Sequence, residues 1–158
     1  MLSSIDIVKY NKAVENFSLK DNLSWQLLQV SFRAKKGLIR VAEAYDLTFV
    51  QVYTLCSIEP GKPLPMNEIA NMLNCDASNV TGIIDRLFSR EYIVRQEKPG
   101  DRRVKMVSLT PEGEKLRQQI VKRIVSYKSE ALGQLNADQK RQLSGLLKQI
   151  LKTPAAPE

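Results

Sequence analysis

The 158-residue chain contains no histidine and only two cysteines. Without an imidazole it cannot form a Ser-His-Asp triad, a Cys-His nucleophile pair, a histidine-ligated metal site or a histidine pH switch. Cys56 and Cys75 are too few for a disulfide framework and lack the close spacing of a zinc site, which indicates a reducing compartment. We therefore expect neither an enzyme nor a protein that holds a metal or a cofactor.

Long apolar runs are also missing. No stretch reaches the roughly 18 consecutive apolar residues that a membrane span needs, and the N-terminus lacks the basic and apolar segments of a signal peptide. We therefore expect a cytoplasmic protein with no membrane contact. A length of 158 residues suits one compact domain with a sizeable core.

The charge is unbalanced and unevenly distributed. The chain has 24 Lys plus Arg against 17 Asp plus Glu, a net charge of +7. Such a balance favours a polyanionic partner, although it also serves solubility alone. Residues 86–105 hold seven basic and three acidic side chains, so +4 of the excess lies in this short segment.

Apolar spacings of three and four predict a long helix over residues 19–45 with two apolar rows, as in a helix that lies between a domain and a partner. The first 18 residues are less regular and offer arm contacts. A capping box of Thr48 and Gln51 predicts the start of the next helix. A short helix over residues 65–73 follows, then Asn74 in the left-handed conformation.

Asp76 is expected to cap a helix over residues 77–90. Its predicted buried stripe consists of Val80, Ile83, Ile84, Leu87 and Phe88. Two β-prone runs, residues 93–96 and 104–109, then flank a basic stretch with a turn at Pro99 and Gly100, which predicts a hairpin. Thr110 begins another long helix that we expect to continue to about residue 135. A second capping box at Asn136 starts the last helix.

This order of elements predicts a mainly α fold with a small β-hairpin wing, namely a winged helix-turn-helix between N- and C-terminal helices. In such modules the second helix enters the major groove and the hairpin reaches the minor groove. Ser78 and Asn79 stand in the first turn of that helix, where side chains meet base edges, and Gly82 leaves room for close approach. Arg86 and Arg90 suit phosphates.

The wing tip carries Asp101, Arg102 and Arg103. A planar guanidinium fits a narrow, electronegative minor groove, and Asp101 is placed to hold Arg103. Two alternatives stay open at this point: the basic tip is only a solvated loop, and Ser78 and Asn79 only assist the Asp76 cap.

Four segments together resemble the MarR family of bacterial transcription regulators. They are residues 79–87 (Asn-Val-Thr-Gly-Ile-Ile-Asp-Arg-Leu), 93–95 (Ile-Val-Arg), 99–103 (Pro-Gly-Asp-Arg-Arg) and 107–113 (Val-Ser-Leu-Thr-Pro-Glu-Gly). The resemblance covers residues 20–151. It implies a homodimeric winged helix-turn-helix repressor or activator, whose N- and C-terminal helices form the dimer and whose wings insert arginine into the minor groove. For the mechanism we expect the two modules to bind successive major grooves of a pseudo-palindromic operator.

Residue by residue, the family's Asp-x-Arg wing motif falls on Asp101 and Arg103, and its Asp-Arg-Leu motif on residues 85–87. The recognition-helix contacts fall on Ser78, Asn79 and Thr81. The chain departs from the family pattern in three places. Pro65 stands where a hydroxyl cap is usual, Glu91 replaces the usual glycine after the recognition helix, and the N-terminal cysteine of peroxide-sensing members is absent.

We expect a helical dimerisation region at residues 1–45 and 115–151, a DNA-binding region at 46–114 and a tail at 152–158. Trp25, Phe32 and Tyr45 are candidates for an effector pocket, with ordinary core packing as the alternative. Cys75 is a candidate redox sensor because a helix N-terminus favours the thiolate, whereas Cys56 lies on an apolar face.

The sequence thus predicts a DNA-binding transcription regulator, specific for a double-stranded sequence and acting as a repressor released by a small molecule or an oxidant. The alternative is a winged-helix module whose basic wing binds an acidic protein.

Overall fold

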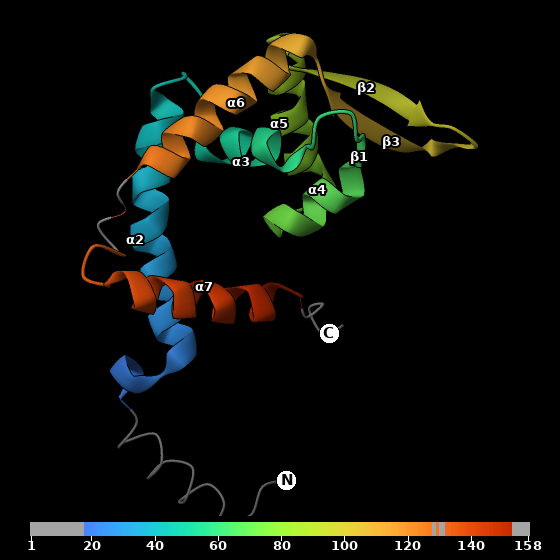
Figure 1. Cartoon of the computed structure of the whole chain (residues 1–158). Coiled ribbons are helices and arrows are strands. Elements are labelled where there is room, and N and C mark those ends of the chain that lie inside the picture. Colours follow the sequence, from blue (N-terminus) through green and yellow to red (C-terminus); the bar gives the residue numbers. More distant parts are fainter. Residues whose placement is uncertain (1–17, 128, 130–131, 153–158) are drawn as a thin grey trace, which may run out of the picture.

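The computed structural model describes residues 18–127, 129 and 132–152 (Figure 1). The expected arm contacts before residue 18 and most of the tail lie outside the described residues. The elements in chain order are η1 (Leu19–Asp21), α2 (Leu23–Glu43), α3 (Phe49–Ser57), β1 (Leu64–Pro65), α4 (Met66–Leu73), α5 (Ala77–Ser89), β2 (Ile93–Lys98), β3 (Asp101–Leu109), α6 (Pro111–Ser126) and α7 (Ala137–Lys152).

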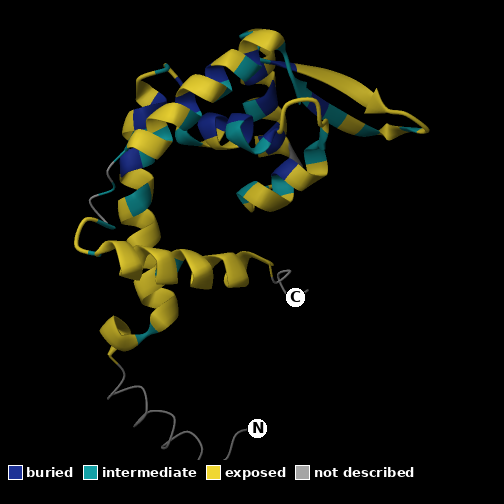
Figure 2. Cartoon of the chain, in the orientation of Figure 1, coloured by how far each residue is buried: buried dark blue, intermediate teal, exposed yellow. Residues whose placement is uncertain are grey.

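The long first helix is shorter than the sequence predicts. Asn22 caps it, because the Asn22 side chain accepts a hydrogen bond from the Trp25 amide at 2.9 Å, and residues 19–21 form a separate 3-10 turn. Its C-terminal third joins the core through Val41 and Ala42. The N-terminal half is largely exposed (Figure 2).

Local capping explains where the helices of the winged module begin. The Gln51 amide donates to Thr48 Oγ1 at 3.3 Å, and the Thr48 amide donates to Gln51 Oε1 at 2.7 Å, so the predicted capping box is confirmed. Asn74 has the predicted left-handed conformation, with φ of 47°, and Asp76 caps α5. These two residues set the turn between α4 and α5.

The sheet has three strands in the order β1, β3, β2. Strands β2 and β3 form the predicted hairpin, and Gly100 makes its turn with φ of 86°. Strand β1 was not predicted, since two residues that include a proline carry no alternating pattern. Leu64 pairs with Val107 and thereby ties the base of the wing to the start of α4.

The core lies where α3, α5 and α6 meet the C-terminal part of α2 and the base of the wing (Figure 2). Val80, Ile84 and Leu87 are buried on α5 as predicted. The prediction for Phe88 is wrong, because its side chain is 48% exposed. Its ring instead faces the Arg95 guanidinium on β2, whose carbon lies 5.0 Å from the ring centroid.

Helix α6 starts at the predicted Thr110 cap, yet it ends at Ser126 and does not continue to residue 135. Tyr127 has extended backbone angles, and its side chain packs so closely on α2 that a Cβ at Gly37 would lie 2.2 Å from the Tyr127 hydroxyl oxygen. Packing between helices therefore overrides the helical apolar pattern. Helix α7 then begins at the predicted second capping box, with Asn136 and Gln139 hydrogen-bonded in both directions.

A single copy leaves two apolar helix faces uncovered. Helix α7 has no buried residue, and the N-terminal half of α2 is almost as open (Figure 2). The most exposed large apolar side chains on these helices are Leu23, Phe32, Leu146, Ile150 and Leu151, between 56% and 82% exposed. None of the described helices is long and apolar enough to cross a lipid bilayer.

Candidate nucleic-acid interface

The N-terminal turn of α5 is built around the Asp76 carboxylate. Oδ1 accepts hydrogen bonds from the Asn79 amide at 2.9 Å and the Ser78 hydroxyl at 2.6 Å, and Oδ2 accepts one from Asn79 Nδ2 at 3.1 Å. The hydrogen bonds from the Ser78 hydroxyl and then from the Asn79 amide hold the pKa of Asp76 below its usual value. Ser78 and Asn79 therefore do assist the cap in the free chain.

The cap does not use up the hydrogen-bonding capacity of Ser78 and Asn79. Both side chains are exposed, and the Ser78 lone pairs and the Asn79 carbonyl oxygen take no part in the bonds to Asp76. Thr81, Gly82 and Arg86 are also exposed along α5. Arg86 has no ion-pair partner among the described residues, so its guanidinium remains available to a phosphate.

A shallow cavity of about 400 Å³ lies along this face. It is lined by Val50, Leu73, Cys75, Ser78, Asn79, Gly82, Ile83 and Arg86. The predicted contact residues at positions 78, 79, 82 and 86 thus border one concave surface at the N-terminal half of α5. Position 82 contributes no side chain to it, and a Cβ added there meets no atom within 4 Å.

Gly82 provides a prediction in which stability and DNA affinity change in opposite directions. Gly82→Ala should raise the free energy of unfolding by about 0.5–1 kcal/mol, because alanine is favoured over glycine inside a helix and the Cβ meets nothing in the chain. If DNA approaches at Gly82, the same methyl group should weaken DNA binding several-fold. Thermal unfolding and a binding titration measure the two effects, and unchanged DNA affinity would remove Gly82 from the contact surface.

Two further arginines make contacts within the winged module itself. Arg90 donates to the backbone carbonyl of Asp46 and lies 3.5 Å from the Asp46 carboxylate, so it ties the end of α5 to the turn after α2. Arg95 pairs with Asp85 and covers the Phe88 ring, which ties α5 to strand β2. The phosphate role of Arg90 stays a prediction, and the Arg95 clamp, formed across ten residues of sequence, was not predicted.

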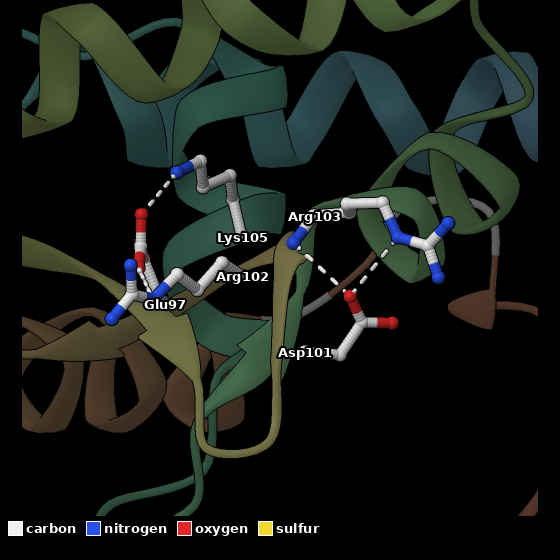
Figure 3. Close-up of polar contacts among 5 residues, drawn as sticks. All are labelled: Glu97, Asp101, Arg102, Arg103 and Lys105. Carbon is white, nitrogen blue, oxygen red and sulfur yellow. Dashed lines mark hydrogen bonds and ion pairs between the residues drawn. The ribbon is translucent and has the colours of Figure 1, made fainter.

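The wing tip has the predicted geometry (Figure 3). Asp101 Oδ1 accepts hydrogen bonds from the Arg103 amide at 3.1 Å and from Arg103 Nε at 3.3 Å. Glu97 similarly pairs with Lys105 at 2.9 Å and with Arg102 at 3.8 Å. The Arg103 side chain is 93% exposed, so Asp101 orients a guanidinium that still projects into solvent.

Glu91 follows α5 in a left-handed conformation with φ of 60°, at the position where the family pattern usually has glycine. A non-glycine residue in this region is strained unless its surroundings fix it. The Thr110 hydroxyl donates to the Glu91 carbonyl at 2.7 Å, and the Thr110 amide donates to the Tyr92 carbonyl at 3.1 Å. These bonds join the end of α5 to the start of α6.

The three candidate pocket residues do not meet within one chain. Trp25 and Phe32 lie on the exposed part of α2, while Tyr45 packs against the core beyond the other end of that helix. At a rise of about 1.5 Å per residue, Trp25 and Tyr45 are roughly 30 Å apart. A shared effector pocket would need a second chain, so this role stays a prediction.

The cysteines differ in their surroundings. Burial raises the pKa of the Cys56 thiol, and this effect outweighs the nearby Arg117, which lowers it. The raised pKa keeps the thiol protonated, which agrees with a core role. Cys75 is half-buried and lines the cavity along α5. Its sensor role stays a prediction.

Known proteins resemble this chain in both sequence and fold. A model of the MarR family matches residues 47–105. The HTH-type transcriptional regulator YhbI of Bacillus subtilis is 34% identical over 101 residues, which are 64% of this chain and 64% of that protein. The multiple antibiotic resistance protein MarR of Salmonella typhimurium is 34% identical over 107 residues, which are 67% of this chain and 74% of that protein. The chain belongs to the MarR family of transcriptional regulators.

A solved structure from the same family shows the same three-dimensional fold. The crystal structure of a cysteine-to-serine variant of Escherichia coli MarR, complexed with operator DNA, superposes with a TM-score of 0.68 at 28% identity. The match covers 82% of this chain and 93% of that one. The predicted winged helix-turn-helix is therefore confirmed, and the name of YhbI describes an HTH-type transcriptional regulator.

Proposed function

We propose that two copies of this chain bind a pseudo-palindromic DNA duplex and regulate transcription, with α5 of each copy in a major groove and each wing in the adjacent minor groove. The observation that carries this proposal is the Arg103 guanidinium, which Asp101 orients although the side chain is 93% exposed. This ion pair does little to stabilise the fold, because an exposed ion pair contributes little to the free energy of unfolding. It suits insertion into a narrow, electronegative groove.

The exposed face of α5 supports the same proposal. Ser78 and Asn79 project polar atoms from its first turn, and Arg86 has no ion-pair partner in the described part of the chain. Base contacts from the first turn would read sequence, whereas Arg86, Arg102 and other basic side chains would contact phosphates. Binding to operator DNA would place the protein in the cytoplasm.

The uncovered helix faces support a homodimer. Helix α7 and the N-terminal half of α2 lie away from the wing (Figure 1), and both carry exposed apolar side chains. A second copy that covers them would place two recognition helices in a two-fold arrangement, which matches the symmetry of a palindrome.

A small-molecule signal would act at the junction between this helical region and the winged module. A cavity of about 360 Å³ lies between α2 and α6, and Arg40 and Arg123 line it. A ligand there would change the angle between the two helices and thus the spacing of the recognition helices, which would release a repressor from its operator. A dimer bound across a promoter would exclude the transcription machinery.

Selection of bound duplexes from a random pool tests the proposal. We expect enrichment of an inverted repeat with half-sites about one helical turn, roughly 10 base pairs, apart. The binding constant should then fall steeply with salt, by ~0.9 log units per log unit of salt for each neutralised phosphate. A module whose wing binds an acidic protein would instead enrich no sequence and show a shallow salt dependence on DNA.

A further inference from the structure

A second concave surface lies at the other end of α5 from Ser78 and Asn79. The last residues of α5, the start of β2 and the first turn of α6 surround a cavity of about 720 Å³. Figure 1 shows where these three elements come together. It is lined by Phe88, Ser89, Glu91, Ile93, Val94, Thr110, Pro111 and Glu112. Its volume is within the range of about 300–1,000 Å³ that small-molecule sites occupy.

Apolar side chains form part of the walls of this cavity and remain partly exposed, although the Arg95 guanidinium lies over the Phe88 ring. Phe88 is 48% exposed and Val94 is 43% exposed, and Ile93 is fully buried beneath them. The elements that carry these side chains, α5 and β2, belong to the winged module and lie away from α7 and the N-terminal half of α2, which we assign to the dimer (Figure 1). An apolar ligand body would remove them from water.

The charge of the cavity is opposite to that of the chain. Its lining includes two carboxylates and no lysine or arginine, whereas the chain as a whole carries +7. Glu91 forms no ion pair with the described residues. Glu112 pairs with Lys115 at 3.3 Å, but both side chains are more than half exposed, so water and a ligand compete easily with that pair.

The backbone that carries the two carboxylates is fixed before any ligand arrives. Thr110 bonds to the carbonyls of Glu91 and Tyr92, and a Cβ at Gly113 would lie only 1.9 Å from the Tyr92 carbonyl oxygen, so α6 packs directly on this turn. Glu91 is held there at a positive φ despite its side chain. A preformed site costs a ligand less ordering free energy.

We propose that this cavity binds a small lipophilic organic cation. Its ammonium group pairs with Glu91 and Glu112, and its apolar body packs on Phe88, Val94 and Pro111. Anions are disfavoured, because no basic side chain lines the cavity and the nearby Arg95 guanidinium is already paired with Asp85. The carboxylates also repel DNA phosphates, which keeps this surface free when the opposite end of α5 is bound.

Such a ligand contacts the recognition helix, the wing and α6 at once. It therefore biases how the three elements lie relative to one another, and by linkage it changes the affinity for DNA by the same factor as DNA changes the affinity for it. This coupling rests on the proposed function, whereas the binding itself does not.

Calorimetric titration of the full chain tests the binding. The probe is 1-naphthylmethylamine, a cation at neutral pH, and its anionic counterpart 1-naphthylacetate is the control ligand. We expect saturable binding of one amine per chain, at least tenfold weaker binding of the acetate, and at least tenfold weaker amine binding by Glu91→Gln/Glu112→Gln. The matched control Glu68→Gln, which changes an exposed acid on α4, should bind like wild type.

A second variant covers the case in which the double variant is poorly folded. Val94→Lys places an ammonium at the cavity from an exposed strand position and should abolish amine binding without altering either carboxylate. Equal binding of the two naphthyl ligands, or wild-type amine binding by the double variant, would overturn the proposal.

Titration of the selected operator separates this proposal from the proposed function. Saturating amine should change operator affinity at least threefold in wild type and leave Glu91→Gln/Glu112→Gln unchanged. Normal operator binding without any effect of the amine would overturn the coupling alone, whereas failure to bind any operator would overturn the proposed function and leave the cation site to the calorimetric result.

Discussion

Arg103→Ala should bind the selected operator about 100-fold more weakly than wild type. A dimer loses two inserted guanidinium groups, and a loss of ~1.4 kcal/mol at each wing corresponds to this factor. The free energy of unfolding should stay unchanged, because the side chain is 93% exposed and its only partner among the described residues is Asp101 on the same tip. The slope of log K against log salt should also become shallower.

Two neighbouring variants separate the roles of charge and geometry. Arg102→Ala removes an equally exposed arginine that the structure pairs with Glu97 instead of Asp101, so we expect a loss of less than about tenfold, the cost of a phosphate contact. Arg103→Lys keeps the charge but not the planar, oriented donor group, so it should recover only part of the affinity. Equal losses for Arg102→Ala and Arg103→Ala would indicate a merely basic tip.

Ile150→Glu should convert a dimer into monomers at micromolar concentration. Ile150 is 56% exposed in the single chain and belongs to the apolar face of α7, which has no buried residue. If a second copy covers this face, the variant buries an unpaired carboxylate at the interface, which is strongly unfavourable. Sedimentation velocity should then report a particle near the chain mass of 17.9 kDa instead of twice that value.

DNA binding should weaken in parallel, by 100-fold or more, because the two recognition helices would no longer be linked and each half-site would bind independently. Gln142→Glu is the matched control, since it adds the same charge to an exposed polar position of the same helix. It should remain dimeric and bind DNA as wild type does. A wild-type chain that sediments as a monomer would contradict the proposed dimer.

Features that depend on neighbouring residues could be predicted from the sequence. The capping boxes at Thr48 and Asn136 and the turn at Gly100 are each specified within a few residues, and all three are confirmed. The contact between Asp101 and Arg103 is of the same kind, because the two residues are two positions apart at a tight turn. For this reason the sequence predicted much of the wing.

Features that depend on packing between distant segments could not be predicted. Helix α6 ends early because the Tyr127 side chain packs on Gly37, about 90 residues away in the chain. Phe88 matches the apolar stripe of α5 by spacing but leaves the core for the Arg95 guanidinium on β2. Strand β1 exists only through its pairing with β3. The cavity beside Glu91 combines three elements and has no local signal.

Hydroxyl-radical footprinting of the selected operator tests the central claim most directly, since the radical attacks sugars along the minor groove that the wings should enter. With the wild-type protein we expect two protected minor-groove segments. Each should lie at the outer edge of one half-site, and the two should be symmetric about the dyad of the operator. Arg103→Ala, at a concentration that still saturates the DNA, should lose these two segments and keep the protection from α5. A footprint without outer minor-groove protection, or one that Arg103→Ala leaves unchanged, would contradict the account.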